Sequence, residues 1–256
     1  MKWRTFDIFR YLLYNYENQG RDRGLIMLPA QVITEHDGFM VVRDDLLPGG
    51  TKRRVLSLMF NDMAAKELVY PSVPFGSGPV AVAESARDTG KTAVLFYPAR
   101  KRENWSRQMK DAEAAGAKII LVEGGNLKTL MKRARDYADT HEDARCLKLG
   151  FDTPQYIDKL AEIARALPVK PKEVWCATGT GTISRALQKA WPEAQHHAVV
   201  IDDRGSTGNA KRHTLKEAFN AVSKPPFPAS EHFEAKAWGI MKRKARRGAL
   251  FWNVGA

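Results

Sequence analysis

The predicted fold is decided by one stretch of sequence, Glu173-Val174-Trp175-Cys176-Ala177-Thr178-Gly179-Thr180-Gly181-Thr182-Ile183-Ser184-Arg185. An apolar strand-like run comes first, residues 178–182 then alternate threonine with glycine, and apolar positions at helical spacing follow over 183–191. A glycine loop between a strand and a helix start directs backbone N–H groups toward one point, where an anion can bind. Gly179 and Gly181 allow a tight turn, and the threonine hydroxyls add donors. The stretch predicts a phosphate site, but a tight connection without a ligand has the same pattern, so a second motif is needed.

Strands and helices alternate through the chain that precedes this stretch. Such alternation predicts right-handed βαβ units in an α/β fold, with an open, mostly parallel twisted sheet and helices on both faces. Ligands of these sheets bind at the carboxyl ends of the strands. The predicted strands are Leu25–Ala30, Phe39–Arg43, Glu67–Val73, Thr92–Tyr97, Lys118–Val122, Ala144–Phe151, Val174–Ala177, His197–Ile201 and Leu250–Val254. The predicted helices are Phe6–Asn18, Thr51–Lys66, Pro79–Asp88, Trp105–Ala115, Leu127–Thr140, Pro154–Leu167, Ile183–Trp191 and Glu234–Arg247.

The composition is that of a soluble cytoplasmic protein. The chain has 256 residues, of which 44% are hydrophobic, and no apolar run approaches the roughly 18 residues of a membrane span. The amino-terminal residues lack the apolar block of a signal peptide. Cys146 and Cys176 both lie in apolar runs, which is typical of reduced, buried thiols. The six histidines show no spacing with cysteines or acids that predicts a metal site.

The net charge of +12 has two interpretations. Basic residues cluster at Arg100–Arg102, at Lys132-Arg133, at Lys211-Arg212 and over Lys242–Arg247. They either form solvated helix faces or form a surface that binds a polyanionic partner such as nucleic acid. If DNA is the partner, the clusters at 100–102, 211–212 and 242–247 should share a face with the mouth of the ligand site, and we expect the first two at the ligand-binding edge of the sheet.

The second motif is Val41-Val42-Arg43-Asp44-Asp45-Leu46-Leu47-Pro48-Gly49-Gly50-Thr51-Lys52-Arg53-Arg54. A strand ends in an Arg-Asp-Asp-Leu segment, a glycine loop follows, and Lys52 lies in the first turn of a helix. The positive end of a helix favours the neutral amine over the ammonium, and partial burial acts in the same direction. A neutral, fixed lysine is what Schiff-base chemistry with an aldehyde requires.

The motif resembles that of the pyridoxal-phosphate-dependent enzymes of fold type II, the group of tryptophan synthase β, threonine dehydratase and D-cysteine desulfhydrase. The resemblance implies that Lys52 binds pyridoxal 5'-phosphate covalently. Three further segments occur in the family's order: the loop Phe75–Pro79, the phosphate-binding loop Thr178–Thr182 and the last strand before Gly255. The resemblance also implies a homodimer. The cofactor-binding residues that it implies are Lys52, Ser77, Gly78, Thr178, Gly179, Thr180, Gly181, Thr182 and Asn253.

The sequence departs from the family pattern at two positions. Pro79 stands where the family usually has an asparagine that contacts the ring hydroxyl. Asn253 replaces a serine or threonine that meets the pyridine nitrogen, although its side chain can still hydrogen-bond an unprotonated nitrogen. The chain is also short for this family, so we expect a trimmed smaller lobe over residues 51–120 and a larger, cofactor-binding lobe over residues 1–50 and 121–256.

The resemblance implies a lyase that acts at the Cα of an amino acid, by elimination, deamination, β-replacement or decarboxylation, with Lys52 as the general acid and base. Tyr70, Ser77 and Tyr97 are candidates for the substrate pocket because they lie at predicted strand ends. Pyridoxal enzymes of this kind also occur in phage DNA-hypermodification systems, where they act on an amino acid attached to a base. Combined with the charge, this indicates a DNA-attached amino acid as an alternative to the free amino acid.

Two other functions fit parts of the sequence. The segment Val199–Gly208 resembles the ribose-phosphate loop of phosphoribosyltransferases, in which Asp202 and Asp203 would hold the ribose hydroxyls. This alternative leaves Lys52 and the terminal strand unexplained. A noncatalytic, basic nucleic-acid-binding protein would explain the charge alone.

Overall fold

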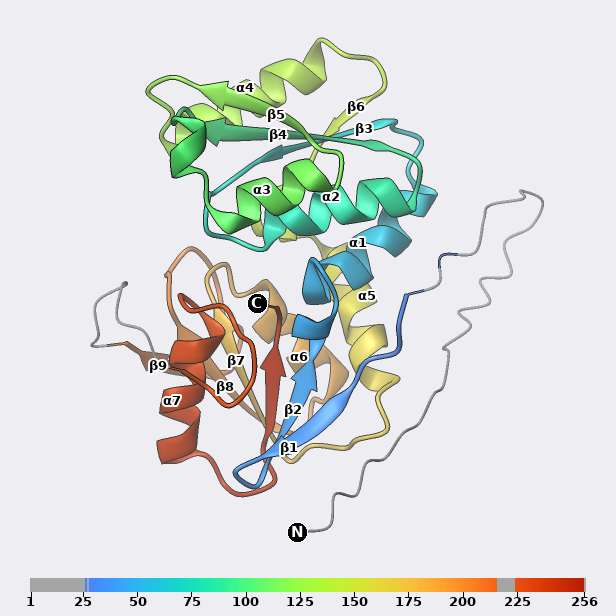
Figure 1. Ribbon diagram of the computed structural model, residues 1–256. Coiled ribbons are helices and arrows are strands. Elements are labelled where there is room, and N and C mark those ends of the chain that lie inside the picture. Colours follow the sequence, from blue (N-terminus) through green and yellow to red (C-terminus); the bar gives the residue numbers. More distant parts are fainter. Residues whose placement is uncertain (1–25, 27, 216–223, 256) are drawn as a thin grey trace, which may run out of the picture.

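The computed structural model describes residues 26, 28–215 and 224–255. It is an α/β structure of two lobes, each built on its own parallel or mostly parallel sheet (Figure 1). The sequence pattern predicted the α/β class and the parallel pairing, which are confirmed, but not the division into two sheets. The predicted helix Phe6–Asn18 lies outside the described residues.

The larger sheet has six strands in the order β1-β2-β10-β7-β8-β9, all parallel except β1. They are β1 (Ile33–His36), β2 (Phe39–Arg43), β7 (Glu173–Thr178), β8 (Gln195–Val200), β9 (Lys211–Thr214) and β10 (Leu250–Asn253). The last strand of the chain, β10, is inserted between β2 and β7, so Trp252 pairs with Val42 on one side and with Cys176 on the other. Its central position explains why all four of its residues are buried.

The hairpin of β1 and β2 corrects one prediction. Residues 26 and 28–30 of the predicted strand Leu25–Ala30 have no strand structure, and Ile33–His36 pairs with β2 instead. The turn is Asp37-Gly38, with φ of 54° and 81°. Both residues adopt positive φ readily, and such turns match the twist of a two-residue hairpin.

The smaller sheet has four parallel strands in the order β5-β4-β3-β6. They are β3 (Glu67–Pro71), β4 (Thr92–Pro98), β5 (Lys118–Val122) and β6 (Ala144–Cys146), flanked by the helices α2 (Gly78–Asp88), α3 (Arg107–Ala114) and α4 (Leu127–Asp139). The sequence analysis expected the smaller lobe to end near residue 120. Because β6 pairs with β3 and α4 packs on both, the smaller lobe continues to Cys146.

Helices cover both faces of the larger sheet. The helices α5 (Pro154–Arg165) and α6 (Thr182–Ala190) pack on one face, and α7 (Glu234–Lys244) packs on the other, where Trp238 and Met241 meet Phe251 and Trp175. The helix α1 (Gly50–Asp62) follows β2 and runs between the lobes (Figure 1). Three short 3-10 helices complete the list: Asp44–Leu46, Arg102–Asn104 and Leu149–Phe151.

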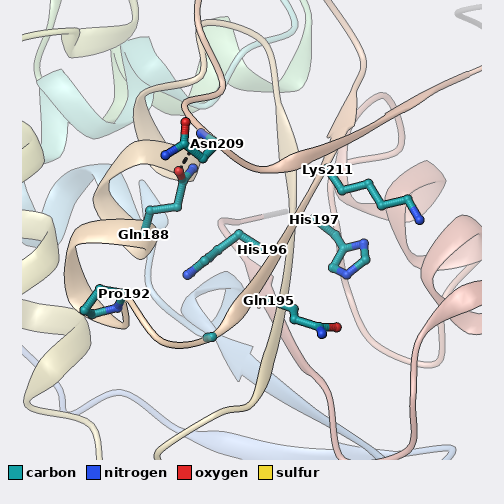
Figure 2. Close-up of a pocket in the computed structure, with 8 residues that line it drawn as sticks. Gln188, Pro192, Gln195, His196, His197, Asn209 and Lys211 are labelled. Atoms are coloured by element: carbon teal, nitrogen blue, oxygen red, sulfur yellow. Dashed lines mark hydrogen bonds between the residues drawn. The ribbon is translucent and has the colours of Figure 1, made fainter.

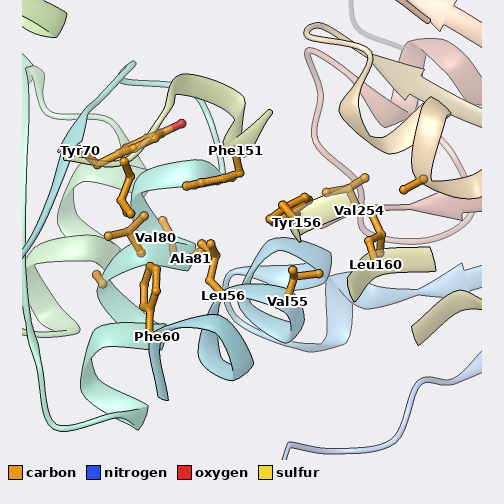
Figure 3. Close-up of a cluster of buried hydrophobic side chains, with 14 of the residues drawn as sticks. Val55, Leu56, Phe60, Tyr70, Val80, Ala81, Phe151, Tyr156, Leu160 and Val254 are labelled. Carbon is orange, nitrogen blue, oxygen red and sulfur yellow. The ribbon is translucent and has the colours of Figure 1, made fainter. Parts of the chain in front are cut away.

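One apolar cluster joins the two lobes (Figure 3). Val55, Leu56 and Phe60 of α1 pack between α2 of the smaller lobe and α5 of the larger one. Leu56 and Phe60 are among the largest fully buried side chains. Burial of side chains of this size stabilises a structure by about 1.5–3 kcal/mol each, so the cluster fixes the relative position of the walls that enclose the site.

Candidate functional site

Lys52 is positioned by the way in which α1 begins. Gly49 and Gly50 have φ of 82° and 57°, and a Cβ atom on Gly50 would lie 1.9 Å from the carbonyl oxygen of Val254. The N–H of Thr51 donates to the same oxygen at 2.9 Å. The glycine thus lets the first turn of α1 dock directly on the end of β10, which places Lys52 at the carboxyl edge of the larger sheet.

The amine of Lys52 points at the smaller lobe. Its Nζ atom donates a hydrogen bond of 2.8 Å to the hydroxyl oxygen of Ser77, just before α2. The side chain is half-buried, and burial lowers the pKa of Lys52, while the carboxyl of Glu234 acts in the opposite direction. A larger fraction of the Lys52 amine is therefore neutral at a given pH than on an exposed lysine.

Glu234 is a site residue that the sequence analysis missed. It is the first residue of α7, is only 5% exposed and lines the same cavity as Lys52. Burial raises its pKa to about 7, although Lys52 partly counteracts the rise. The sequence signal was a single acid at the start of a basic helix, which the helix dipole alone explains. Only the fold reveals that this acid faces a lysine about 180 residues away in sequence.

The loop Thr178–Thr182 has the strand–loop–helix geometry that the sequence predicted. It joins β7 to α6, which begins at Thr182. Gly181 has φ of 77°, and its N–H donates to Thr178 Oγ1 at 2.9 Å. The N–H groups of the first turn of α6 have no acceptor within the helix. They are therefore oriented for an anion.

The two glycines of this loop are not equivalent. A Cβ atom on Gly181 would lie 1.9 Å from the backbone oxygen of Ser206, whereas one on Gly179 would meet its nearest neighbour, Cβ of Asp202, at an ordinary 3.7 Å. Only Gly181 has a positive φ. The backbone therefore requires a glycine at 181 and leaves room for a side chain at 179.

One cavity between the lobes brings most of the predicted residues together. Its lining includes Lys52, Ser77, Gly78, Thr178, Gly179, Thr180 and Thr182, together with Tyr70, Asp202, Arg204 and Glu234. Gly181 does not line the cavity; it is the N-cap residue of α6, which begins at Thr182. The amine, the phosphate-type loop and a buried acid therefore share one cavity.

Asn253 has a different environment from the one predicted. It does not line the cavity. Its Nδ2 atom donates to Asp45 Oδ1 at 2.7 Å and to the carbonyl oxygen of Pro228 at 2.9 Å. Its Oδ1 atom is buried and has no hydrogen-bond partner among the described residues. The Asn253 amide nitrogen therefore ties β10 to the Arg-Asp-Asp-Leu segment, and its contact with a ring nitrogen stays a prediction.

Comparison with known proteins was made by sequence and by structure. No protein-family model matches the chain, and no curated protein matches it in sequence. Its structure is similar to that of an ACC deaminase homologue, at 12% identity and a TM-score of 0.75 over 91% of each chain. It is also similar to a hydrogen sulfide-producing enzyme solved with an α-aminoacrylate intermediate, at 11% identity and a TM-score of 0.62 over 88% of this chain and 84% of that one. A third match is diaminopropionate ammonia lyase from Escherichia coli, at 14% identity and a TM-score of 0.57 over 85% of this chain and 77% of that one.

The chain has the fold of the fold type II enzymes. The predicted α/β fold class and the resemblance to the fold type II enzymes are both confirmed at the level of the fold. The cavity that contains Lys52 lies at the carboxyl ends of β2, β7 and β10.

The remaining candidates from the sequence are dispersed. Tyr70 lines the cavity, and its hydroxyl accepts a hydrogen bond from Gly150 N–H at 3.2 Å. Tyr97 is fully buried and does not line it. Asp202 lines the cavity and pairs with Arg204, but Asp203 pairs with Arg212 outside it. The two acids that a ribose-phosphate loop would use together therefore do not face one site.

A second, larger hollow of about 580 Å³ lies at the other end of β8 (Figure 2). It is lined by Gln188, Pro192, Ala194, Gln195, His196, His197, Asn209 and Lys211. Its polar groups are largely bound to one another or to neighbouring groups. Gln188 Oε1 accepts from the N–H of Asn209 at 2.8 Å, and His197 Nδ1 lies 3.0 Å from His213 Nε2. The larger volume of this hollow therefore does not by itself identify a functional site.

The basic clusters do not share a face, which corrects the expectation drawn for a DNA partner. Arg100–Arg102 follows the carboxyl end of β4, whereas Lys211-Arg212 begins β9 and Lys242–Arg247 ends α7 and precedes β10. The last two clusters therefore lie toward the amino ends of the strands, away from the cavity. Several of their members are paired, as in Lys242–Asp37 and Arg212–Asp203, both at 2.7 Å. Solvated surface charge explains these two clusters.

Two negative findings concern the described residues. Within 28–215 and 224–255, no helix has the length and apolar character that crossing a membrane requires. The same part of the chain contains no group of three histidine, cysteine or acidic side chains placed to bind a metal ion.

Proposed function

We propose that this protein is a pyridoxal-phosphate-dependent enzyme that acts at the Cα of an amino acid, by elimination or deamination. The observation that supports it most directly is the single cavity that contains both the amine of Lys52 and the Thr178–Thr182 loop. The structural neighbours support the same class, because their names describe an ACC deaminase homologue, two ammonia lyases and a hydrogen sulfide-producing enzyme.

The residues present fit pyridoxal 5'-phosphate. An aldehyde needs a lysine whose pKa is lowered, and Lys52 meets that requirement. A phosphate monoester needs several N–H and O–H donors at one point, which the loop before α6 supplies. The ring nitrogen needs a polar group in the cavity wall. Asn253 was predicted for this role but does not line the cavity, whereas the buried Glu234 does, and we propose Glu234 for the contact.

We assign the following roles to residues of this chain. Lys52 would hold the cofactor and then remove or return the proton at the substrate's Cα. Ser77 would orient the amine through the 2.8 Å hydrogen bond. When bound, the cofactor acts as an electron sink that lowers the barrier to breaking a bond at Cα. The two lobes enclose the cavity, which limits the access of water to the reacting atoms.

The reaction can be tested directly with free amino acids. Incubation with a set of amino acids bearing a β-leaving group should release ammonia and a 2-oxo acid, and Lys52→Ala should abolish this turnover. Asp203→Ala is the matched control, because Asp203 lies outside the cavity and should leave turnover unchanged. Retention of this turnover in the Lys52 variant would contradict the proposal. Release of carbon dioxide without ammonia would indicate decarboxylation.

We propose, as a narrower form of this function, that the amino acid is attached to a modified base in DNA. Of the basic clusters, only Arg100–Arg102 supports this narrower form. It follows the carboxyl end of β4, and the carboxyl end of the neighbouring strand β3 lines the cavity through Tyr70. Binding to duplex DNA should then weaken with salt by a log–log slope of about −0.9 per phosphate contacted. Glutamine at residues 100–102 should flatten this slope, and glutamine at residues 242–244 should not. Equal effects of the two sets, or no binding at low salt, would contradict this narrower form.

A further inference from the structure

The cavity contains a cation that the function above does not use. Among the described residues that line it, Lys52 and Arg204 are the only basic ones. Arg204 follows β8 on the crossover toward β9. The sequence analysis drew attention to this segment for its acids, Asp202 and Asp203, and not for its arginine.

The segment of Arg204 is fixed against the phosphate-type loop by backbone contacts. The N–H of Arg204 donates to the carbonyl oxygen of Gly179 at 3.1 Å. A Cβ atom on Gly205 would lie 2.3 Å from the carbonyl oxygen of Thr180, so only a glycine allows this approach. On the other side of the contact, a Cβ atom on Gly181 would lie 1.9 Å from the carbonyl oxygen of Ser206. The two loops therefore form one packed unit, and Arg204 is part of the wall around the anion site.

The side chain of Arg204 is available to a ligand. It pairs with Asp202 at 2.6 Å, but the two side chains are 41% and 34% exposed, and exposed pairs of this kind contribute little. The positive charge of Arg204 also affects the hydroxyl of Tyr70 in the opposite wall of the cavity. Burial raises the pKa of the Tyr70 hydroxyl to about 12, and Arg204 counteracts that rise. Arg204 therefore lies close to the space between Tyr70 and the Thr178–Thr182 loop.

The loop itself supplies no positive charge. Residues 178–182 are all threonine or glycine, so they offer dipoles, whereas a phosphate monoester carries about −1.5 to −2 charges at neutral pH. An arginine beside the loop would supply charge-assisted hydrogen bonds, which are about twice as strong as neutral ones.

We propose that Arg204 is a phosphate-binding residue, which pairs with the 5'-phosphate of the cofactor and is held ready for it by Asp202. This inference rests on the proposed function, because it takes the cofactor as the ligand. It adds a specificity: the site should discriminate between pyridoxal 5'-phosphate and pyridoxal through a side chain, in addition to the backbone of the loop.

The chain contains a matched control for this arginine. Arg212 and Asp203 form a second Arg–Asp pair at 2.7 Å, with side chains 46% and 66% exposed. The acids of the two pairs are adjacent in sequence, and both arginines are partly exposed. Only the first pair lines the cavity. Arg204→Gln and Arg212→Gln therefore remove the same charge from similar surroundings.

The test is equilibrium binding of pyridoxal 5'-phosphate and of pyridoxal to cofactor-free protein, followed by absorbance. Arg204→Gln should weaken binding of the phosphorylated form about tenfold to a hundredfold and leave pyridoxal affinity within about twofold of wild type. Arg212→Gln should change neither. Asp202→Asn should weaken binding of the phosphorylated form less than Arg204→Gln does, because Arg204 keeps its charge and loses only the partner that holds it in place. Thermal melts of each variant check that the fold is intact.

Several results would overturn the proposal. An equal loss for both ligands would mean that Arg204 supports the loop structurally, and no loss for either would mean that it does not reach the phosphate. An unchanged cofactor affinity with a raised KM for the amino acid would place Arg204 at the substrate instead. If the wild-type protein binds neither ligand, the proposed function fails and this inference fails with it. If it binds both equally well, only this inference fails.

Discussion

Lys52 of α1 and Ser77 of the loop before α2 are joined by a hydrogen bond of 2.8 Å from Nζ to Oγ. The two residues belong to segments that the sequence separates by a strand and that the fold brings to one cavity wall. The bond fixes the direction of an amine that burial makes easier to deprotonate. Its role can be tested by removing the hydroxyl alone.

Replacing Ser77 with alanine should lower kcat about twofold to tenfold, because an intramolecular hydrogen bond between neutral groups contributes about 0.5–1.5 kcal/mol. Cofactor should remain bound, since Lys52 is still present. Ser77→Thr keeps the hydroxyl and should recover most of the rate. Steady-state kinetics with a cofactor titration measure both quantities. An alanine variant with normal kcat would show that the bond does not orient the amine.

The buried carboxyl of Glu234 predicts a pH dependence of stability in the cofactor-free protein. Its pKa is raised by burial to about 7, so the folded state retains a proton that the unfolded state releases near pH 4. The contribution is complete below the unfolded pKa and is lost as pH rises through 7. The free energy of unfolding should therefore fall between about pH 4.5 and 7.

Glu234→Gln removes this titration and should flatten that part of the curve. Denaturant unfolding at a series of pH values measures it. The free energy of unfolding of the glutamine variant minus that of the wild type should also be larger at pH 8 than at pH 4. Parallel curves for the two proteins across this range would show that the carboxyl does not titrate as its burial implies.

The two glycines of the phosphate-type loop should respond differently to alanine. Gly181→Ala places a Cβ atom 1.9 Å from the Ser206 oxygen at a positive φ, and should cost at least about 2 kcal/mol of stability. Gly179→Ala meets its nearest atom at 3.7 Å and should cost less than about 1 kcal/mol. Thermal unfolding of both variants checks this contrast. Equal losses would mean that the close contact with Ser206 does not exist.

The sequence predicted the local features of the molecule well, because they depend on neighbouring residues. The alternation of strands and helices over residues 67–200, the glycine start of α1 before Lys52 and the loop at residues 178–182 appear close to where they were expected. Each depends on periodicity or on backbone freedom that a glycine supplies within a few residues.

Features that depend on long-range pairing could not be predicted in the same way. Nothing near Ala144–Cys146 indicates that it pairs with β3 and extends the smaller lobe. Which side of β10 faces the cavity depends on register with β2 and β7, and this register directs Asn253 to Asp45. Glu234 and Arg204 lie among ordinary surface charges in the sequence, and only the fold gives them a common cavity with Lys52.

The central claim is that Lys52 binds pyridoxal 5'-phosphate covalently. The most direct measurement is borohydride reduction of the purified, cofactor-loaded protein, followed by peptide mapping of the tethered cofactor. The account predicts an absorbance band that reduction removes, with the adduct on Lys52. Lys52→Ala should fold normally, because alanine in the first turn of a helix costs little, but should yield no adduct there. An adduct on another lysine, or a protein that acquires no chromophore with the cofactor, would contradict the account.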